Sequence, residues 1–321
     1  MPEQIHLGFG IDKNFGKFAG ITITSLVHNN IGHDLIVHIV YDELLPEDME
    51  KLQQMERLYR NLTLRFYQIT STEGMTFVVP PGHITQAMYY RYLFADMLPE
   101  TVTRLIYMDA DIICKGDILP LWQLDLQGKV LAAARDYGED RSCDRIGLKN
   151  GRYFNSGVLL MNVDVFREKN LVRAVLDYAV SHRDRLTCPD QDALNGALCE
   201  LTVPLHPRWN WHDGLTRRIL KNDPRERFWR GVTPRQAVEA ALEPGILHYQ
   251  GVHKPWRYNW RYEGERYERA MREAGLLHGP LPGRTLPAIL KKHLYRPVYR
   301  MTRNKILRLQ KQFEKEDGTC S

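Results

Sequence analysis

Short apolar segments alternate with helix-like segments through the first part of the chain. Residues 5–9, 36–41 and 62–67 have the length and residue content of strands, and residues 20–29 and 46–58 between them have the pattern of helices. Alternation of strand and helix at these spacings is typical of a mostly parallel sheet with helices on both faces. The sequence therefore predicts an α/β fold.

A further apolar segment, residues 103–108, ends directly on Asp109 and Asp111. In an extended chain both side chains project to the same side, with their Cα atoms about 7 Å apart. Two neighbouring carboxylates at the end of a buried strand need compensation by a divalent cation or by Lys and Arg. The carboxyl ends of strands form the ligand site of open α/β sheets, so the pair predicts a metal that clamps a diphosphate. Capping and loop hydrogen bonds are the alternative explanation of an isolated Asp-x-Asp.

Length and composition narrow the class of protein. The chain has 321 residues, enough for one large or two modest domains, and 43% hydrophobic residues, enough for a core. No apolar run approaches the roughly 18 residues of a membrane span, and the first residues lack the features of a signal peptide. Five cysteines without a C-x-x-C pair argue against a disulfide framework or a zinc knuckle. We expect a cytoplasmic protein with reduced thiols.

Basic residues concentrate near the end of the chain. Residues 284–315 carry ten Lys and Arg against one Glu, interleaved with apolar and aromatic residues. This composition is typical of a segment that lies on an anionic membrane surface, and the apolar share favours a membrane over nucleic acid. A packed or solvated helical tail is the remaining alternative. Prolines 280, 282 and 287 mark a boundary, which predicts a globular domain over 1–279 and a membrane-associating segment over 280–321.

Polar residues follow or interrupt several of the predicted elements. Asp12 and Asn14 follow the first strand and could hydrogen bond to a base or ribose. Arg91, on a helix-like segment, could hold a phosphate or pair with an acid, and a surface salt bridge is the alternative. Asn155 lies in a predicted polar turn before a buried strand and could bind a sugar hydroxyl, although Asn-Ser-Gly is also an ordinary turn.

Two later segments add a helix start and a possible nitrogen ligand. Asp190 and Asp192 flank Gln191 at a predicted helix start, where either acid could simply cap the helix. A lone histidine is usually structural, but His248 added to two carboxylates suits Mn²⁺ better than Mg²⁺. Lys254 is a point charge suited to a phosphate oxygen.

In this order the motifs resemble those of the retaining glycosyltransferases of family 8, most closely the bacterial lipooligosaccharide and lipopolysaccharide galactosyl- and glucosyltransferases. The resemblance covers roughly residues 5–260, and its motifs are Asp12-Lys13-Asn14, Tyr90-Arg91-Tyr92-Leu93, Tyr107-Met108-Asp109-Ala110-Asp111, Phe154-Asn155-Ser156-Gly157-Val158-Leu159-Leu160, Asp190-Gln191-Asp192-Ala193-Leu194-Asn195 and the segment from His248 to Trp256. It implies a GT-A type fold, a mixed nucleotide-binding sheet flanked by helices, followed by a basic amphipathic helical tail. It also implies a peripheral position on the inner face of the bacterial inner membrane.

The resemblance assigns a role to each candidate residue. Asp109, Asp111 and His248 would bind Mn²⁺, with Mg²⁺ as an alternative. The other assignments are uridine for Asp12 and Asn14, the diphosphate for Gly251 and Lys254, the donor sugar for Arg91, Asn155, Asp190 and Gln191, and donor or acceptor hydroxyls for His83 and Asp136. A salt bridge with Arg135 is the alternative role of Asp136.

The resemblance also implies the reaction: transfer of glucose or galactose from a UDP-sugar to a lipopolysaccharide core or related glycan, with an α linkage. Double displacement needs a carboxylate nucleophile, and the matching position is the amide Gln191. This favours front-face transfer in which a UDP phosphate oxygen accepts the acceptor's proton, with Asp190 the nearby acid that would allow double displacement.

Two other classes remain open from the residues. A sugar-nucleotide pyrophosphorylase would be expected to open with a glycine-rich basic loop, which residues 8–12 are not. A non-catalytic membrane-surface protein would leave the two aspartates and His248 without a purpose. A nucleic-acid partner is not expected.

Overall fold

The computed structural model describes residues 2–71, 86–136, 140–148, 152–212, 215, 232–251, 254–256, 264–275 and 285–318. Its chain forms two compact units, each assembled from separate stretches of sequence. The first comprises Met1–Gly20, Asn30–Ala110 and Asp117–Leu205, and the second comprises Ile21–Asn29, Asp111–Gly116 and His206–Ser321.

The first unit is built on a seven-stranded sheet of order β3-β2-β1-β4-β7-β6-β8. Its strands are β1 (Gln4–Ile11), β2 (Asp34–Tyr41), β3 (Leu62–Gln68), β4 (Arg104–Met108), β6 (Leu131–Arg135), β7 (Phe154–Asn162) and β8 (Thr202–Leu205). Six of them are parallel, and β7 runs antiparallel between β4 and β6. The predicted mixed and mostly parallel sheet is confirmed.

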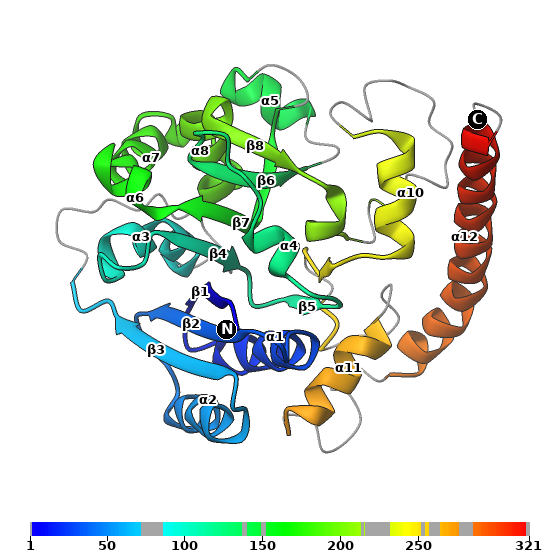
Figure 1. The fold of residues 1–321 in the computed structure, drawn as a ribbon, viewed down its shortest axis with the longest axis horizontal. Coiled ribbons are helices and arrows are strands. Elements are labelled where there is room, and N and C mark those ends of the chain that lie inside the picture. Colours follow the sequence, from blue (N-terminus) through cyan, green and yellow to red (C-terminus); the bar gives the residue numbers. More distant parts are fainter. Residues whose placement is uncertain are drawn as a thin grey trace. The chain divides into compact units, whose positions relative to one another are not determined.

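Helices flank this sheet (Figure 1). They are α1 (Gly16–Asn29, which runs on into the second unit), α2 (Pro46–Leu58), α3 (Tyr90–Met97), α4 (Leu119–Trp122), α5 (Asp140–Ile146), α6 (Val163–Glu168), α7 (Leu171–Ser181) and α8 (Pro189–Leu198), with short 3₁₀ turns η1 (Gln86–Tyr89), η2 (Arg183–Arg185) and η3 (Cys199–Leu201). One apolar cluster joins α3, α6, α7 and α8 to β4, β6 and β7. This core fixes the strand ends and helix starts from which the polar residues project.

Two glycines of β1 allow α3 to approach the sheet closely. A Cβ atom on Gly8 would lie 2.8 Å from the Leu105 side chain and 3.0 Å from the Phe94 ring, and one on Gly10 would lie 2.8 Å from the Tyr90 Cβ. Side chains alternate along a strand, so Leu7 and Phe9 point to the opposite face, where they are buried. The segment around Gly8 and Gly10 is thus a packing surface for the helix that carries Arg91.

The second unit contains a two-stranded antiparallel sheet and helices. Its elements are β5 (Ile112–Cys114), η4 (Pro207–Asn210), α10 (Pro234–Leu242), β9 (Ile246–His248), α11 (Gly264–Glu273) and α12 (Leu286–Gly318). A capping box between Thr233 and Gln236 begins α10. The guanidinium of Arg235 donates to the carbonyl of Phe313 at 3.0 Å, which ties α10 to α12.

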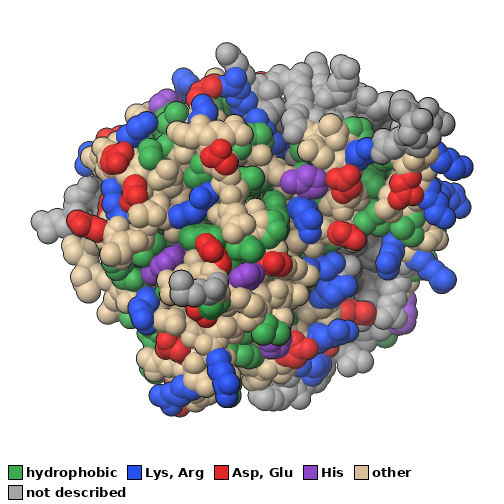
Figure 2. Space-filling view, viewed as in Figure 1, with side chains coloured by type: hydrophobic (Ala, Val, Ile, Leu, Met, Phe, Trp, Pro, Cys, Tyr) green, Lys and Arg blue, Asp and Glu red, His purple; other side chains and the backbone are tan. Residues whose placement is uncertain are grey.

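The predicted helical tail is one helix, α12, with 33 residues. Ile306 is buried, whereas Leu286, Leu290, Leu294 and Met301 are between 56% and 72% exposed. Figure 2 shows Lys and Arg side chains along the same helix. Among the helices that the structure describes, none is both long and apolar enough to cross a membrane. The predicted boundary at residue 280 lies outside the described residues.

Candidate active site

The two aspartates flank a turn between strands of the two sheets. β4 ends at Met108, whose partner in β7 is Val158, and the Asp109 N–H donates to the carbonyl of Gly157 at 2.9 Å. Asp111 precedes β5, and its carbonyl accepts from the Tyr249 N–H at 2.9 Å. The prediction of an extended chain through Asp109 and Asp111 is wrong, because Ala110 and Asp111 form a turn between β4 and β5.

Asp111 is a buried carboxylate that faces two nitrogen groups. Its Oδ1 lies 3.2 Å from His248 Nε2, and its Oδ2 pairs with Lys254 Nζ. Burial alone would raise the pKa of Asp111, but Lys254 and His248 together lower that pKa well below its ordinary value. Asp111 therefore carries a full negative charge at neutral pH.

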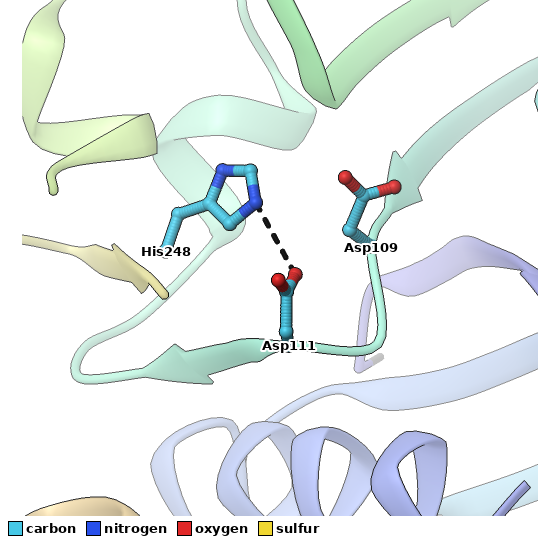
Figure 3. Close-up of side chains that lie close together, drawn as sticks. All are labelled: Asp109, Asp111 and His248. Carbon is cyan, nitrogen blue, oxygen red and sulfur yellow. Dashed lines mark ion pairs between the residues drawn. The ribbon is translucent and has the colours of Figure 1, made fainter. Parts of the chain in front are cut away.

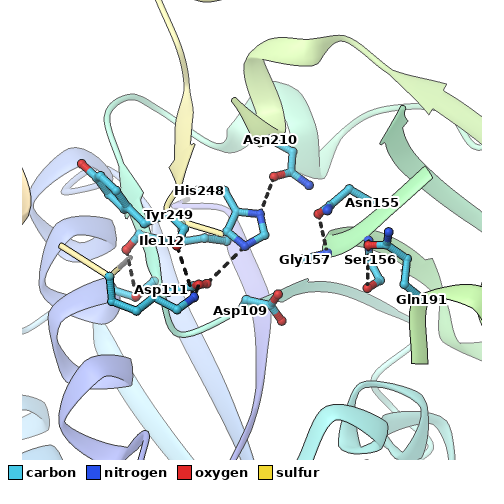
Figure 4. Close-up of polar contacts among 12 residues, drawn as sticks. Asp109, Asp111, Ile112, Asn155, Ser156, Gly157, Gln191, Asn210, His248 and Tyr249 are labelled. Carbon is cyan, nitrogen blue, oxygen red and sulfur yellow. Dashed lines mark hydrogen bonds and ion pairs between the residues drawn. The ribbon is translucent and has the colours of Figure 1, made fainter. Parts of the chain in front are cut away.

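Asn210 orients the ring of His248 (Figure 4). The Asn210 side-chain oxygen lies 2.8 Å from His248 Nδ1, and both residues are buried. A carbonyl oxygen only accepts, so Nδ1 carries a hydrogen, and Nε2 faces Asp111. Sequence reasoning missed Asn210, and its amide after Trp209 gave no motif that would have selected it.

The residues present fit a divalent cation (Figure 3). Asp109 and Asp111 are separated only by Ala110, and ligand atoms of Asp109, Asp111 and His248 all lie within 4.8 Å of one another. Asp111 Oδ1 and His248 Nε2 lie 3.2 Å apart, and when Nε2 carries no hydrogen both atoms can bind one cation. Two carboxylates with one imidazole suit Mn²⁺ and related divalent ions.

Arg91 is buried and uses its donors inside the first unit. Its Nη2 lies 3.2 Å from Asp109 Oδ1 and 3.0 Å from Asp190 Oδ2, and its Nη1 donates to the carbonyl and hydroxyl oxygens of Ser156, each at 2.7 Å. Its Nε donates to the carbonyl of Met88 at 2.8 Å. The alternative of a surface salt bridge is wrong, because Arg91 joins two buried or half-buried acids from different elements.

Tyr107, like Asn210, is a positioning residue that the sequence did not identify; it was predicted only as part of a strand. Its hydroxyl donates to Asp109 Oδ1 at 2.8 Å, and the Arg91 guanidinium lies 5.0 Å from its ring centre. Asp109 is therefore oriented by a neutral and a charged donor together. The available signal was a hydroxyl at the end of an otherwise apolar strand.

Gln191, Asp136 and Asn155 form one hydrogen-bonded group in the first unit. Gln191 Nε2 and Asn155 Nδ2 donate to Asp136 Oδ2 at 3.0 Å and 3.2 Å. Gln191 Oε1 accepts from the Ser156 N–H at 3.0 Å, so its amide is oriented at both ends. These contacts give Asp136 two amide partners. Asn155 and Ser156 lie inside β7 and not in the predicted turn, because β7 begins at Phe154 and pairs with β6 there.

The two acids of the helix start have different surroundings. Asp192 is fully buried and accepts from the Thr187 and Cys188 N–H groups, the Tyr153 hydroxyl and Arg145. Asp192 thus accepts from backbone N–H groups just before α8 and anchors the start of that helix, but the N-cap residue is Cys188, which has no side-chain cap. Asp190 instead faces Arg91, and burial raises its pKa while Arg91 opposes that shift.

The residues predicted to contact uridine and the diphosphate lie in loops of the structure. Asp12 is buried after β1 and accepts from the Asn14 N–H at 2.9 Å and from the Asn14 side-chain amide at 3.4 Å, and Asn14 is exposed. Gly251 has φ of +85° and is exposed, a backbone conformation that favours glycine. His83 lies outside the described residues.

The chain belongs to glycosyl transferase family 8, whose sequence profile matches residues 6–260. General stress protein A of Bacillus subtilis (strain 168) is 28% identical over 265 residues, 81% of this chain and 90% of that protein. The lipopolysaccharide 1,2-glucosyltransferase of Escherichia coli (strain K12) is 29% identical over 262 residues, 80% of this chain and 74% of that protein.

A solved structure shares the fold. The galactosyltransferase LgtC, in complex with donor and acceptor sugar analogs, superposes with a TM-score of 0.71 and 20% identity over 86% of this chain and 97% of that chain. The GT-A type α/β fold and the family resemblance are confirmed. Family membership also argues against the pyrophosphorylase and the non-catalytic membrane protein as alternatives.

Proposed function

We propose that the protein is a retaining hexosyltransferase that moves glucose or galactose from a UDP-sugar to a lipopolysaccharide core or related glycan, with an α linkage and with Mn²⁺ as its cofactor. The observation that carries this proposal is the ligand set of Asp109, Asp111 and His248 in a chain of family 8. The relatives named as lipopolysaccharide 1,2-glucosyltransferase and 1,3-galactosyltransferase support the choice of sugars and acceptor.

We assign separate roles to the residues that would bind the metal, the diphosphate and the uridine. Asp109, Asp111 and His248 would hold the cation, which neutralises the diphosphate as UDP leaves. Lys254 and Gly251 would contact the diphosphate, and Asp12 and Asn14 the uridine. Because Arg91 contacts both Asp109 and Asp190, it links the metal ligands to the residues around the donor sugar.

The surroundings of Gln191 and Asp190 favour front-face transfer. Gln191 is an amide whose orientation is fixed by Ser156 and Asp136, so its oxygen can stabilise positive charge on the sugar without forming a bond. The charge of Asp190 is balanced by Arg91 at 3.0 Å, which makes its carboxylate a poorer nucleophile. In this mechanism a UDP phosphate oxygen accepts the proton of the acceptor hydroxyl, and Asp136, Asn155 and His83 contact sugar hydroxyls.

We also propose that α12 holds the enzyme on an anionic membrane surface, on the inner face of the bacterial inner membrane. Exposed Leu286, Leu290, Leu294 and Met301 on a strongly basic helix support this. A lipopolysaccharide acceptor would be reached at such a surface.

The experiment that tests the function is a donor and acceptor screen. UDP-glucose and UDP-galactose are each incubated with truncated lipopolysaccharide cores in Mn²⁺, and the product linkage is read by NMR. We expect an α-linked hexose from one of the two donors. Transfer of neither sugar, or a β linkage, would contradict the proposal.

A further inference from the structure

Lys254 forms an ion pair with Asp111, one of the proposed metal ligands. Its Nζ pairs with Asp111 Oδ2 and donates to the carbonyl of Tyr249 at 3.2 Å. The ammonium also lies 5.6 Å from the centre of the Trp256 ring. All of these residues belong to the second unit, so the pair is defined within one compact body. Asp111 has Lys254 on one oxygen and His248 on the other, and Figure 4 shows the contact with His248.

An ammonium group and a divalent cation that both contact this carboxylate repel each other. Both are positive, and their repulsion grows with the product of the charges and is weakly screened at a buried site. The Asp111 side chain is only 8% exposed, so water does little to separate the two charges. A cation that binds Asp111 must therefore weaken the contact with Lys254.

Lys254 is able to leave. Its side chain is 21% exposed and sits on a flexible four-carbon stem, which lets the ammonium move while the backbone stays in place. Leaving Asp111 deprives the ammonium of its counter-charge. A nucleoside diphosphate bound to the metal supplies a new one within the same site.

We propose that Lys254 is an exchangeable counter-ion: it occupies Asp111 in the free protein and moves to the diphosphate when metal and nucleotide bind together. This inference rests on the proposed metal and donor site and concerns how the two ligands assist each other. Metal alone binds against Lys254, whereas metal with UDP binds with its help. By linkage, UDP then tightens metal binding by the same factor by which metal tightens UDP binding.

The test compares Lys254→Met with the wild-type protein, using Mn²⁺ alone and UDP as probes. Free Mn²⁺ is followed by EPR during titration, and UDP binding in saturating Mn²⁺ by calorimetry. We expect Lys254→Met to bind Mn²⁺ alone roughly tenfold more tightly and UDP roughly tenfold more weakly, within the usual range of coupling between sites. Lys254→Arg keeps the charge and should bind Mn²⁺ as the wild type does.

Two further variants make the result decisive. Lys169→Met removes the same charge from an exposed position at the end of α6 and should leave Mn²⁺ binding unchanged. Asp111→Asn reports on the metal site itself. If Asp111→Asn loses Mn²⁺ but Lys254→Met binds it no more tightly than the wild type, the exchange is wrong and the metal site stands. If Asp111→Asn binds Mn²⁺ as well as the wild type, the proposed metal site and the exchange both fail.

Discussion

His248 depends on its neighbour Asn210 for the orientation of its ring. The side-chain oxygen of Asn210 lies 2.8 Å from Nδ1, which leaves Nε2 to face Asp111. Partners of this kind fix the tautomer of a metal-binding histidine, and their loss usually lowers metal affinity. Asn210 therefore acts as a positioning residue for the proposed metal site.

We expect Asn210→Leu to weaken Mn²⁺ binding by roughly 10- to 100-fold, because the imidazole loses the acceptor that holds Nδ1–H. Asn210→Asp keeps an acceptor at the same place and should retain most of the affinity. Titration of Mn²⁺ with EPR detection measures both. A leucine variant that is folded by circular dichroism and binds Mn²⁺ as the wild type does would show that Asn210 only fills space.

The sequence indicates the metal ligands but not the side chains that orient them. The types and order of Asp109, Asp111 and His248 were enough to suggest a metal, because carboxylate and imidazole ligands are chemically distinctive. The partners of these side chains were not predictable, since Asn210 is 38 residues from His248 and Lys254 is 143 residues from Asp111. Such pairs are created by the fold and leave no local pattern.

The helices and strands that depend mainly on local sequence were predicted correctly. The helix expected over 46–58 is α2 (Pro46–Leu58), and the first three predicted strands lie within β1, β2 and β3. The turn after β4 was mispredicted because it depends on pairing of β4 with β7 and of β5 with β9, which are distant in sequence. The same long-range pairing places Asn155 and Ser156 inside a strand.

Three neighbouring strands carry a chain of hydrogen-bonded polar rings, and the central ring, His38, is buried. His6 Nδ1 lies 2.9 Å from His38 Nε2, and His38 Nδ1 lies 3.0 Å from the Tyr67 hydroxyl. Burial, with smaller effects of His6 and Arg65, lowers the pKa of His38 to about 3. In the unfolded chain a histidine titrates near pH 6.5. Between these values the unfolded state binds the extra proton, so folding stability falls as the pH drops from about 6.5 toward 3.

We expect His38→Gln to flatten this part of the stability profile, because an amide can keep the hydrogen bonds but does not titrate. The wild type should lose up to about 1.4 kcal/mol per pH unit through His38. Urea unfolding at several pH values measures the slope, with His293→Gln at an exposed position of α12 as the control. Equal slopes for the wild type and His38→Gln would mean that His38 is not held neutral by the fold.

At the scale of the whole molecule, α12 combines a packed side with an exposed apolar side. Ile306 is buried and Arg235 holds Phe313, whereas Leu290 and Leu294 are 56% and 72% exposed. The residues proposed to bind metal and nucleotide all precede this helix in the sequence. Surface attachment and donor chemistry should therefore be separable by mutation.

Deletion from Pro287 onward should abolish binding to anionic vesicles and leave slow hydrolysis of the UDP-sugar. The deletion removes nine Lys and Arg residues, each worth about 1 kcal/mol near an anionic surface. Because the deletion also removes contacts to α10, a Leu290→Glu/Leu294→Glu variant tests attachment with the helix in place. Vesicle flotation measures binding. If the full-length protein does not bind anionic vesicles at low salt, this role of α12 is ruled out.

In the proposed reaction, Asp109 and Asp111 hold a divalent cation on which sugar transfer depends. The most direct measurement is the rate of UDP release from the preferred UDP-sugar in Mn²⁺ and in EDTA, for the wild type, Asp109→Asn and Asp111→Asn. Each substitution removes a charged ligand with almost no change in volume, so the fold should remain intact. We expect activity in Mn²⁺ alone, and a loss of at least about 100-fold in EDTA and in either variant. Undiminished release in EDTA, or from a folded Asp111→Asn protein, would contradict the claim.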